Sequence, residues 1–258
     1  MKVRFGCLIL LLAEISGQPI TAQQVTSPLS TALAAQASTV TVQDVTLSGS
    51  VESIAGSDDE TVPFTFKAIS SGSARIDVNL AAGTLTEIRQ SSTAGNSGVW
   101  SLGGGANHAM LGHNLMTDAA WFFPLFIVQR LLTDQNAVVA VVGTSNGMMH
   151  IQAVEKAPPN LTATASTQVQ HLSQIDLYLD TTSLLPVGLA YNMHPDNNAL
   201  LDISVYIQFS NYQQTSGVNV PMHIQKFVNN TLTMDVQVQS VALNTGLTQA
   251  NFAAQAVQ

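Results

Sequence analysis

The sequence is poor in charge and in cysteine, and each shortage excludes a class of protein. Charged residues make up only 9% of the 258 residues, against a usual share of roughly 25%. Charge-driven disorder requires high charge and low hydrophobicity, so a chain with 46% apolar residues is expected to fold. Acidic residues outnumber basic ones by 16 to 8, so the chain lacks the positive charge that non-specific binding to nucleic acid requires. We therefore expect a globular protein that does not bind nucleic acid.

The single cysteine lies in a segment that has the features of a secretory signal peptide. A short basic segment precedes the apolar run Phe5–Ala13, which is far shorter than the roughly 20 residues of a transmembrane helix. We predict that residues 1–22 are a signal peptide cleaved after Ala22, and that residues 23–258 form one domain exported to the periplasm or cell envelope. Cleavage removes Cys7, so the mature chain is expected to have no disulfide, no thiol nucleophile and no thiolate metal site.

Most of the remaining chain alternates apolar and polar residues with a period of two, as strands with one buried face do. Phe64 and Phe66 illustrate the pattern in the first half of the chain, and Val205, Ile207 and Phe209 illustrate it in the second. Turns rich in Gly, Asn and Ser separate these runs at short intervals. The spacing predicts a mainly β domain whose antiparallel sheet is built from hairpins rather than from βαβ units.

One apolar segment breaks the alternation. Residues Thr117–Leu132 would be apolar on most sides of any helix they formed, which predicts that this helix is buried or faces an apolar partner. Pro124 lies inside the segment and should end or kink a helix, so we predict two short helical pieces within an insert at about 112–133. A further short helix is expected at Pro28–Gln36, with Ser27 as its N-cap.

The C-terminal third has a distinctive order of turn residues and strand aromatics. The residues that carry this order are Asp180–Pro186, Phe209–Tyr212, Gly217–Pro221, Val241–Asn244 and Phe252, to which Gly98–Trp100 adds a turn into a central strand. This order resembles that of the LolA/LolB-like group of periplasmic lipoprotein carriers. The resemblance implies one antiparallel sheet of about eleven strands, curled into a half-barrel with short helices over its concave face. It also implies a non-enzymatic carrier whose apolar hollow holds a lipid or the acyl chains of a lipoprotein.

The aromatic part of the insert is the candidate binding site. The residues expected to line the hollow or its lid are Trp100, Trp121, Phe122, Phe123, Leu125 and Phe126. Two interpretations are open: the insert is a lid over a lipid site, or it is a plug that fills the hollow as ordinary core. Burial energy does not choose between them, because an aromatic side chain gains about as much from contact with protein as from contact with lipid. Arg75 and Arg89 are the nearby basic residues, and neither has the proline neighbour of the lid-holding arginine in the carriers.

Two other patterns suggest catalysis or metal binding. Gly143–Gly147 matches G-x-S-x-G with Ser145 in the position of a nucleophile, but a nucleophile elbow requires a helix directly after the turn. The segment that follows is short and stops at Pro158, so a hairpin turn explains the pattern better. The six histidines, His108 and His113 among them, show no zinc-ligand spacing with each other or with a carboxylate.

The sequence therefore predicts an exported, non-catalytic carrier of a lipid or of lipoprotein acyl chains, without cofactor or metal. The alternative is a structural or partner-binding envelope protein whose hollow is plugged by its own helices, and a serine hydrolase is the third hypothesis. The expected partners are a lipid or an acylated lipoprotein and an envelope membrane protein, and we expect the chain to be a monomer.

Overall fold

The computed structural model describes residues 22–92, 95–117 and 122–253. The predicted signal peptide lies outside these residues except for Ala22, where the first helix begins. Trp121, one of the predicted binding residues, also lies outside them. No helix within the described part of the chain combines the length and the apolarity of a membrane-spanning segment.

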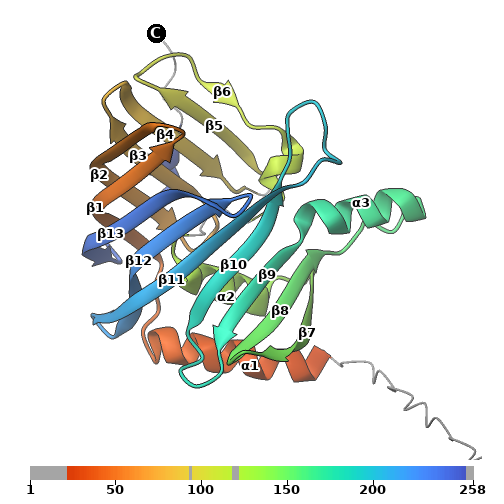
Figure 1. The fold of residues 1–258 in the computed structure, drawn as a ribbon. Coiled ribbons are helices and arrows are strands. Elements are labelled where there is room, and N and C mark those ends of the chain that lie inside the picture. The colour runs from red at the N-terminus through yellow and green to blue at the C-terminus, as the bar shows by residue number, and fades with distance from the viewer. Residues whose placement is uncertain (1–21, 93–94, 118–121, 254–258) are drawn as a thin grey trace, which may run out of the picture.

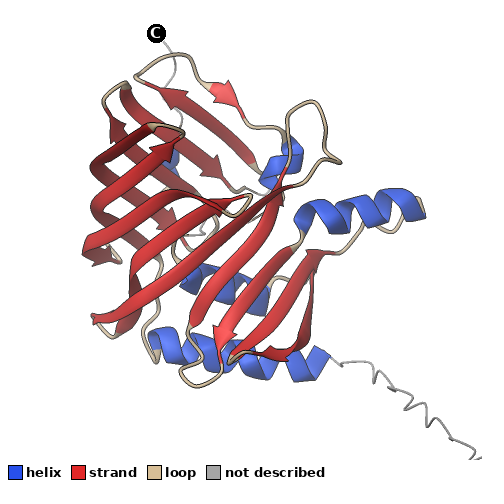
Figure 2. Ribbon diagram, in the orientation of Figure 1, coloured by secondary structure: helices blue, strands red, loops and turns tan. Residues whose placement is uncertain are grey.

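The described residues form one sheet of thirteen strands (Figures 1 and 2). In chain order the strands are β1 (Asp44–Ala55), β2 (Asp58–Ile69), β3 (Ala74–Leu80), β4 (Gly83–Gln90), β5 (Ser97–Leu102), β6 (His108–Ala109), β7 (Ala137–Ser145), β8 (Met148–Glu155), β9 (Ile175–Asp180), β10 (Pro186–Met193), β11 (Ile203–Thr215), β12 (Val218–Val228) and β13 (Thr231–Leu243). The count exceeds the predicted one of about eleven, and the edge strand β6 is too short for any alternation to reveal it. The prediction of a mainly β, antiparallel sheet is confirmed.

The order of strands makes the sheet an open half-barrel. Across the sheet the order is β6-β5-β4-β3-β2-β1-β13-β12-β11-β10-β9-β8-β7, so the first and last strands pair in the middle and β6 and β7 are the edges. Figure 1 shows the sheet curling around α1 and α2. A bulge at Gln239 of β13, opposite Ser48 and Gly49 of β1, contributes to this bend. Gly49 permits it, because a Cβ there would meet the carbonyl oxygen of Gln237.

Alternation and tight turns account for the strands. In β9 the side chains of Ile175, Leu177 and Leu179 are buried and the residues between them are not, as a period of two requires. The hairpin between β7 and β8 turns on Asn146 and Gly147, whose φ values are +50° and +75°. Two successive residues with positive φ make the type of turn that matches the twist of paired strands.

Helices cover the concave face and one end of the sheet, and the short η2 packs on its outer face. They are α1 (Ala22–Ala37), η1 (Gly112–Leu115), α2 (Pro124–Thr133), α3 (Ala163–Ser173) and η2 (Gln249–Phe252). Helix α1 contacts α2, β7 and β12, whereas α3 packs against β8. Helix α1 begins earlier than predicted and contains Pro28 in its interior, where proline removes one backbone hydrogen bond. Burial of Leu29 and Ala32 in the core offsets this cost.

The C-terminal segment folds back onto the outer face of the sheet. Phe252 is fully buried there against Ile69 and Ile88. The buried carboxylate of Asp44 anchors the segment, because it accepts hydrogen bonds from the backbone N–H groups of Thr245 (2.8 Å), Gly246 (2.9 Å) and Leu247 (3.3 Å). Burial alone raises the pKa of Asp44, but these hydrogen bonds outweigh it and hold the pKa below its ordinary value.

Candidate binding site

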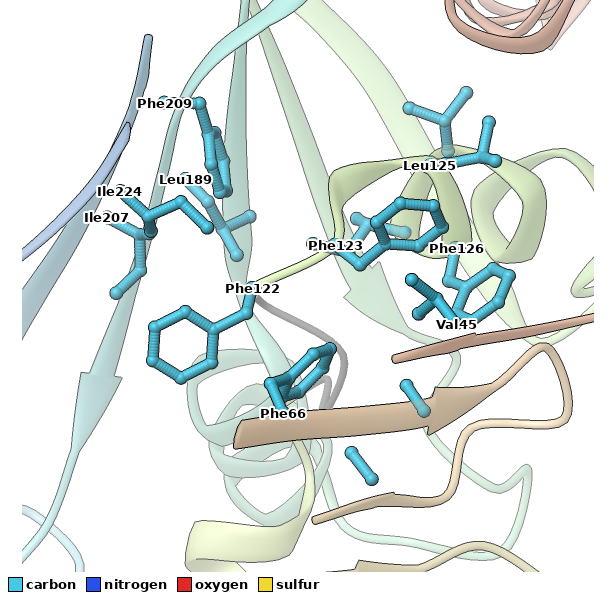
Figure 3. Close-up of a cluster of buried hydrophobic side chains, with 14 of the residues drawn as sticks. Val45, Phe66, Phe122, Phe123, Leu125, Phe126, Leu189, Ile207, Phe209 and Ile224 are labelled. Atoms are coloured by element: carbon cyan, nitrogen blue, oxygen red, sulfur yellow. The ribbon is translucent and has the colours of Figure 1, made fainter. Parts of the chain in front are cut away.

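The centre of the concave face is occupied by the aromatic end of the insert. The ring of Phe122 lies 5.3 Å from that of Phe66 and 5.9 Å from that of Phe64, both on β2. The ring of Phe123 meets that of Phe126 edge to face at 4.9 Å. Figure 3 shows Phe66, Phe122, Phe123 and Phe126 together in one cluster of buried side chains. Phe122, Phe123 and Phe126 are at most 3% exposed, so this part of the insert is core in the present conformation.

Helix α2 is buried on nearly all sides, as the sequence pattern predicted. Pro124 begins it, and a proline in the first turn costs no hydrogen bond. The insert therefore contains one described helix after Pro124, and the predicted piece before it falls partly on residues 118–121, outside the described part. Leu125 is 1% exposed, and Ile127 and Val128 are fully buried. Because α2 lies between α1 and the sheet, an apolar surface on most sides is what its position requires.

Trp100 lies apart from this packed centre. On β5 it pairs with Glu87 of β4 and with His108 of β6, so it shares the concave face with them. Its ring stacks on that of His108 at 4.3 Å and is 42% exposed. Leu102, two residues further on the same face, is equally exposed. The wing of the sheet formed by β4, β5 and β6 is therefore less covered than its centre.

The space left in the hollow is unevenly distributed. Beside Phe122 a cavity of only about 10 Å³ remains, lined by Phe66, Ile76 and Arg89 among others, and such a space scarcely admits one water molecule. A cavity of about 410 Å³ lies between α2, the segment before it and the ends of β1 to β5. This volume is in the range of small-molecule sites. The existing space is thus at one end of the hollow and not at its apolar centre.

The wall of the larger cavity is partly polar and carries two basic side chains. Its wall includes Gln43, Gln90, Asn96, Gln129, Arg89 and Arg130. No acidic side chain is among the described residues that line it. The Nη1 atom of Arg89 donates to the carbonyl oxygen of Asn114 (2.9 Å), which ties η1 to β4, and its Nε atom donates to Glu87 (2.9 Å). Two guanidinium groups and several amides are suited to an anionic or hydrogen-bonding group.

Comparison with solved structures identifies the architecture. No family model and no curated protein matches the sequence. A domain from Vibrio parahaemolyticus, described as an outer membrane lipoprotein-sorting protein domain, matches with a TM-score of 0.56 at 10% identity, covering 90% of this chain and 97% of its own. The fold is LolA-like.

Two further structures agree with this assignment. A DUF1329 family protein from Desulfovibrio piger has a TM-score of 0.56 at 11% identity and covers 91% of this chain and 99% of its own. A LolA superfamily protein from Nitrosomonas europaea has a TM-score of 0.50 at 7% identity and covers 89% of this chain and 97% of its own. At such low identity these likenesses establish the fold alone. They confirm the predicted LolA-like half-barrel.

The LolA-like hollow of this chain also contains charged groups that the sequence analysis missed. Lys226 of β12 pairs with Ile207 and with Met234, so it lies on the concave face. Burial lowers the pKa of Lys226, whereas the charge of Glu87 raises it. Burial has the opposite effect on Tyr191 and raises the pKa of its hydroxyl, on which the charges of Glu87 and Arg89 also act. The alternation of β12 places Lys226 in the same row as Val220, Met222 and Ile224, and that register was the signal available in the sequence.

The two basic residues singled out by sequence lie on opposite faces of the LolA-like sheet. Arg75 pairs with Lys67 and Ile88 on the outer face, where it forms an ion pair with Asp77 at 2.7 Å. Arg89, in contrast, lines the cavity and contacts η1. Of the two, therefore, Arg89 is positioned to hold the insert.

The G-x-S-x-G pattern is a hairpin turn. Ser145 is the last residue of β7, and β8 begins at Met148. Because a strand follows in place of a helix, the backbone geometry of a nucleophile elbow is not formed at Ser145. The alternative explanation from sequence, a turn between paired strands, is the one observed.

Proposed function

We propose that the chain is an exported, non-catalytic binder that carries a lipid or the acyl chains of a lipoprotein in the cell envelope. One observation supports this most strongly: a helix that is apolar on most of its sides is buried against the sheet and α1. Displacing α2 and the phenylalanines before it would open a hollow lined by buried apolar side chains from β1, β2 and β9 to β12. An acyl chain is the ligand that matches such a surface.

The burial energy of an acyl chain is of similar size to that of the two phenylalanines before α2, so exchange of these rings for ligand is feasible. Each buried phenylalanine contributes at most about 4–6 kcal/mol, from roughly 150–250 Å² of surface at 25 cal/mol/Å². An acyl chain gains about 0.8 kcal/mol for each buried methylene. About 10–15 methylenes therefore offset the loss of contacts made by Phe122 and Phe123. This is the length range of common fatty acyl chains.

The polar cavity provides a place for the other end of such a ligand. Arg89 and Arg130 supply positive charge beside the apolar surface of Phe126 and Leu115. A carboxylate or phosphate bound there would form charge-assisted hydrogen bonds, while the acyl chain extended into the hollow. The proposed ligand is therefore an amphiphile with an anionic head. Its donor or acceptor would be an acylated lipoprotein or an envelope membrane protein, with the chain acting as a monomer.

The direct test is to purify the protein from its own envelope and to identify extracted lipid by mass spectrometry. Uptake of a fluorescent fatty acid by the delipidated protein is the second readout. The proposal predicts co-purifying lipid or saturable uptake at one site per chain. Recovery without lipid, together with no uptake of the fatty acid, would contradict it.

A second candidate is supported by the packing itself. Only about 10 Å³ is left beside Phe122, so the hollow can equally be a solid core that stabilises a structural or partner-binding envelope protein. The two candidates differ in the response to truncation at Phe122. A lid competes with the ligand, so truncation should tighten lipid binding; a plug has no ligand, so truncation should only destabilise.

A further inference from the structure

Three histidines and one aspartate converge at the mouth of the half-barrel, although they are distant in sequence. His113 belongs to η1, His171 lies near the end of α3, and His194 and Asp202 lie in the loop between β10 and β11. The His194 ring lies between the other two, with ring centroids 6.1 Å from His113 and 5.6 Å from His171. Sequence spacing did not reveal this group, because four separate places in the chain contribute to it.

The donor atoms of three of these residues are close enough to share one ion. Potential ligand atoms of His171, His194 and Asp202 all lie within 4.8 Å of one another. The Nε2 atom of His171 is 2.9 Å from Oδ1 of Asp202, and Nδ1 of His194 is 3.5 Å from the same oxygen. Ligands of a tetrahedral zinc ion lie about 2.0–2.2 Å from the metal, so two neighbouring donor atoms lie about 3.3–3.6 Å apart. The separations of 2.9 Å and 3.5 Å are close to this range. His171 and Asp202 are 38% and 44% exposed, which leaves their side chains free to adjust.

Unsatisfied ring nitrogens are a second, independent feature of the group. The side chain of His194 is fully buried, and among the described residues its Nε2 atom has no hydrogen-bond partner. The Nε2 atom of His113 is buried and unpartnered in the same way. Buried polar atoms are rarely left without a partner. The Nε2 atom of His194 is not the nitrogen that faces Asp202, since that one is Nδ1, which also lies 3.2 Å from the carbonyl oxygen of Leu201. The unpartnered atoms therefore show that the rings of His113 and His194 each keep an unused ligand nitrogen.

Two other histidine–aspartate pairs show what a purely structural contact looks like in this fold. His150 contacts Asp176 at 2.6 Å and His223 contacts Asp235 at 2.9 Å. Each of these carboxylates also accepts hydrogen bonds from two glutamine side chains. Neither pair includes a second histidine, and within the described residues only the group of His171, His194 and Asp202 has metal-ligand geometry.

We propose that His171, His194 and Asp202 bind a divalent transition metal ion of the zinc class, with His113 or water available for the fourth position. Two imidazoles and one carboxylate form a ligand set that suits zinc.

The site would connect the insert to the opposite side of the half-barrel. Asn114 already brackets His194, since its Oδ1 atom accepts from the backbone N–H of His194 (2.9 Å) and its Nδ2 atom donates to the carbonyl of His194 (2.8 Å). With His113 in the fourth position, the metal would reinforce this contact between η1 and the β10–β11 loop. Because η1 precedes α2, the ion would then fix one end of the segment that covers the hollow, whether that segment acts as a lid or as a plug.

The experiment is titration of the chelator-treated full-length mature protein with Zn²⁺ by calorimetry, and with Co²⁺ by visible absorption. We expect one ion per chain and a Co²⁺ spectrum typical of low coordination number. Asp202→Asn and His171→Ala alter half-exposed side chains, so these variants should fold, and each should weaken binding at least about tenfold. His223→Ala is the matched control, because His223 contacts an aspartate at 2.9 Å as His171 does but lies on the outer face. This variant should bind the metal as tightly as the wild type. Absence of stoichiometric binding, equal binding by the Asp202 and His171 variants, or equal loss in His223→Ala would overturn the proposal.

Discussion

The centre and the polar end of the hollow differ in one decisive property, which is the space available. At the centre Phe122 and its neighbours leave about 10 Å³, whereas the end beside Arg89 and Arg130 contains a cavity of about 410 Å³. The centre is apolar and filled, and the end is polar and open. For an amphiphile, the site for the head is therefore preformed and the site for the acyl chain requires movement of the insert.

This difference separates affinity into two parts. The head gains contacts without rearrangement, so its contribution depends on the two arginines. The acyl chain must first displace buried aromatic rings, so its apparent affinity is reduced by the stability of the closed insert. Substitutions at the centre should accordingly change stability and acyl affinity together, whereas those at the polar end should affect selectivity for the head.

The largest effect is expected at the centre, for Phe122→Ala. Loss of a fully buried phenylalanine should lower the free energy of unfolding by about 3–5 kcal/mol, measurable by urea denaturation. If α2 is a lid, fatty-acid affinity should rise at least about tenfold, because the closed state is weakened by more than 1.4 kcal/mol.

Phe252→Ala is the matched control for this variant, because Phe252 is equally buried but lies on the outer face. It should lose similar stability without any gain in fatty-acid affinity. Equal affinity changes in both variants would mean that the centre does not compete with the ligand.

The next largest effect is expected at Asp44, which anchors the C-terminal segment close to the polar end. Asp44→Ala leaves three backbone N–H donors without their carboxylate and should cost about 1.5–3 kcal/mol at pH 7. The pKa of Asp44 is lowered on folding, so its contribution is complete above the unfolded pKa of about 3.9 and is lost as the pH falls through the folded value.

The stability difference between wild type and Asp44→Ala should therefore be constant from about pH 7 to pH 5 and shrink below about pH 4. Urea denaturation at several pH values measures it. A difference that grew on acidification would contradict the proposed role of the carboxylate.

A smaller and more selective effect is expected for Arg130→Gln at the polar end. Loss of a charge-assisted hydrogen bond should weaken binding of a fatty acid about tenfold, while binding of its uncharged methyl ester should change little. Arg75→Gln, on the outer face, should leave both affinities unaltered. Competition with a fluorescent fatty acid provides the measurement, and equal weakening for acid and ester would show that Arg130 does not bind the head.

The smallest effect is expected for Ser145→Ala in the turn between β7 and β8. The side chain is exposed, so the free energy of unfolding should change by no more than about 0.5 kcal/mol. Lipid uptake should also be unaltered. Loss of a detectable esterase activity in this variant would revive the hydrolase hypothesis.

Period-two alternation was sufficient to predict the sheet, because inward side chains such as Ile175, Leu177 and Leu179 must alternate with outward ones. Two elements escaped this method. The two-residue strand β6 is too short to alternate, and α3 has little apolar periodicity since only Leu172 and Ser173 at its end are buried. The N-cap Thr162, whose side chain accepts from the N–H of Ala165, was the remaining signal for α3.

The candidate site was predictable only where one segment supplies it. Phe122 to Phe126 are contiguous, so their burial was expected from a segment that would be apolar on most sides of a helix. The polar cavity joins β1, β4 and α2, and the histidine group joins η1, α3 and the β10–β11 loop. Such groups depend on strand order and curvature, neither of which is encoded in local spacing. Trp100 lies on the concave face, and its place in a binding site stays a prediction. Its 42% exposure depends on how far the covering helices extend, which local spacing does not reveal.

The exchange of amide hydrogens in α2, with and without saturating fatty acid, tests the displacement of the insert most directly. Ligand binding in the hollow should increase exchange of residues 124–133 while β9 to β12 keep their protection. Fatty acid that binds while α2 stays equally or better protected would contradict a lid, and would place the ligand outside the apolar centre.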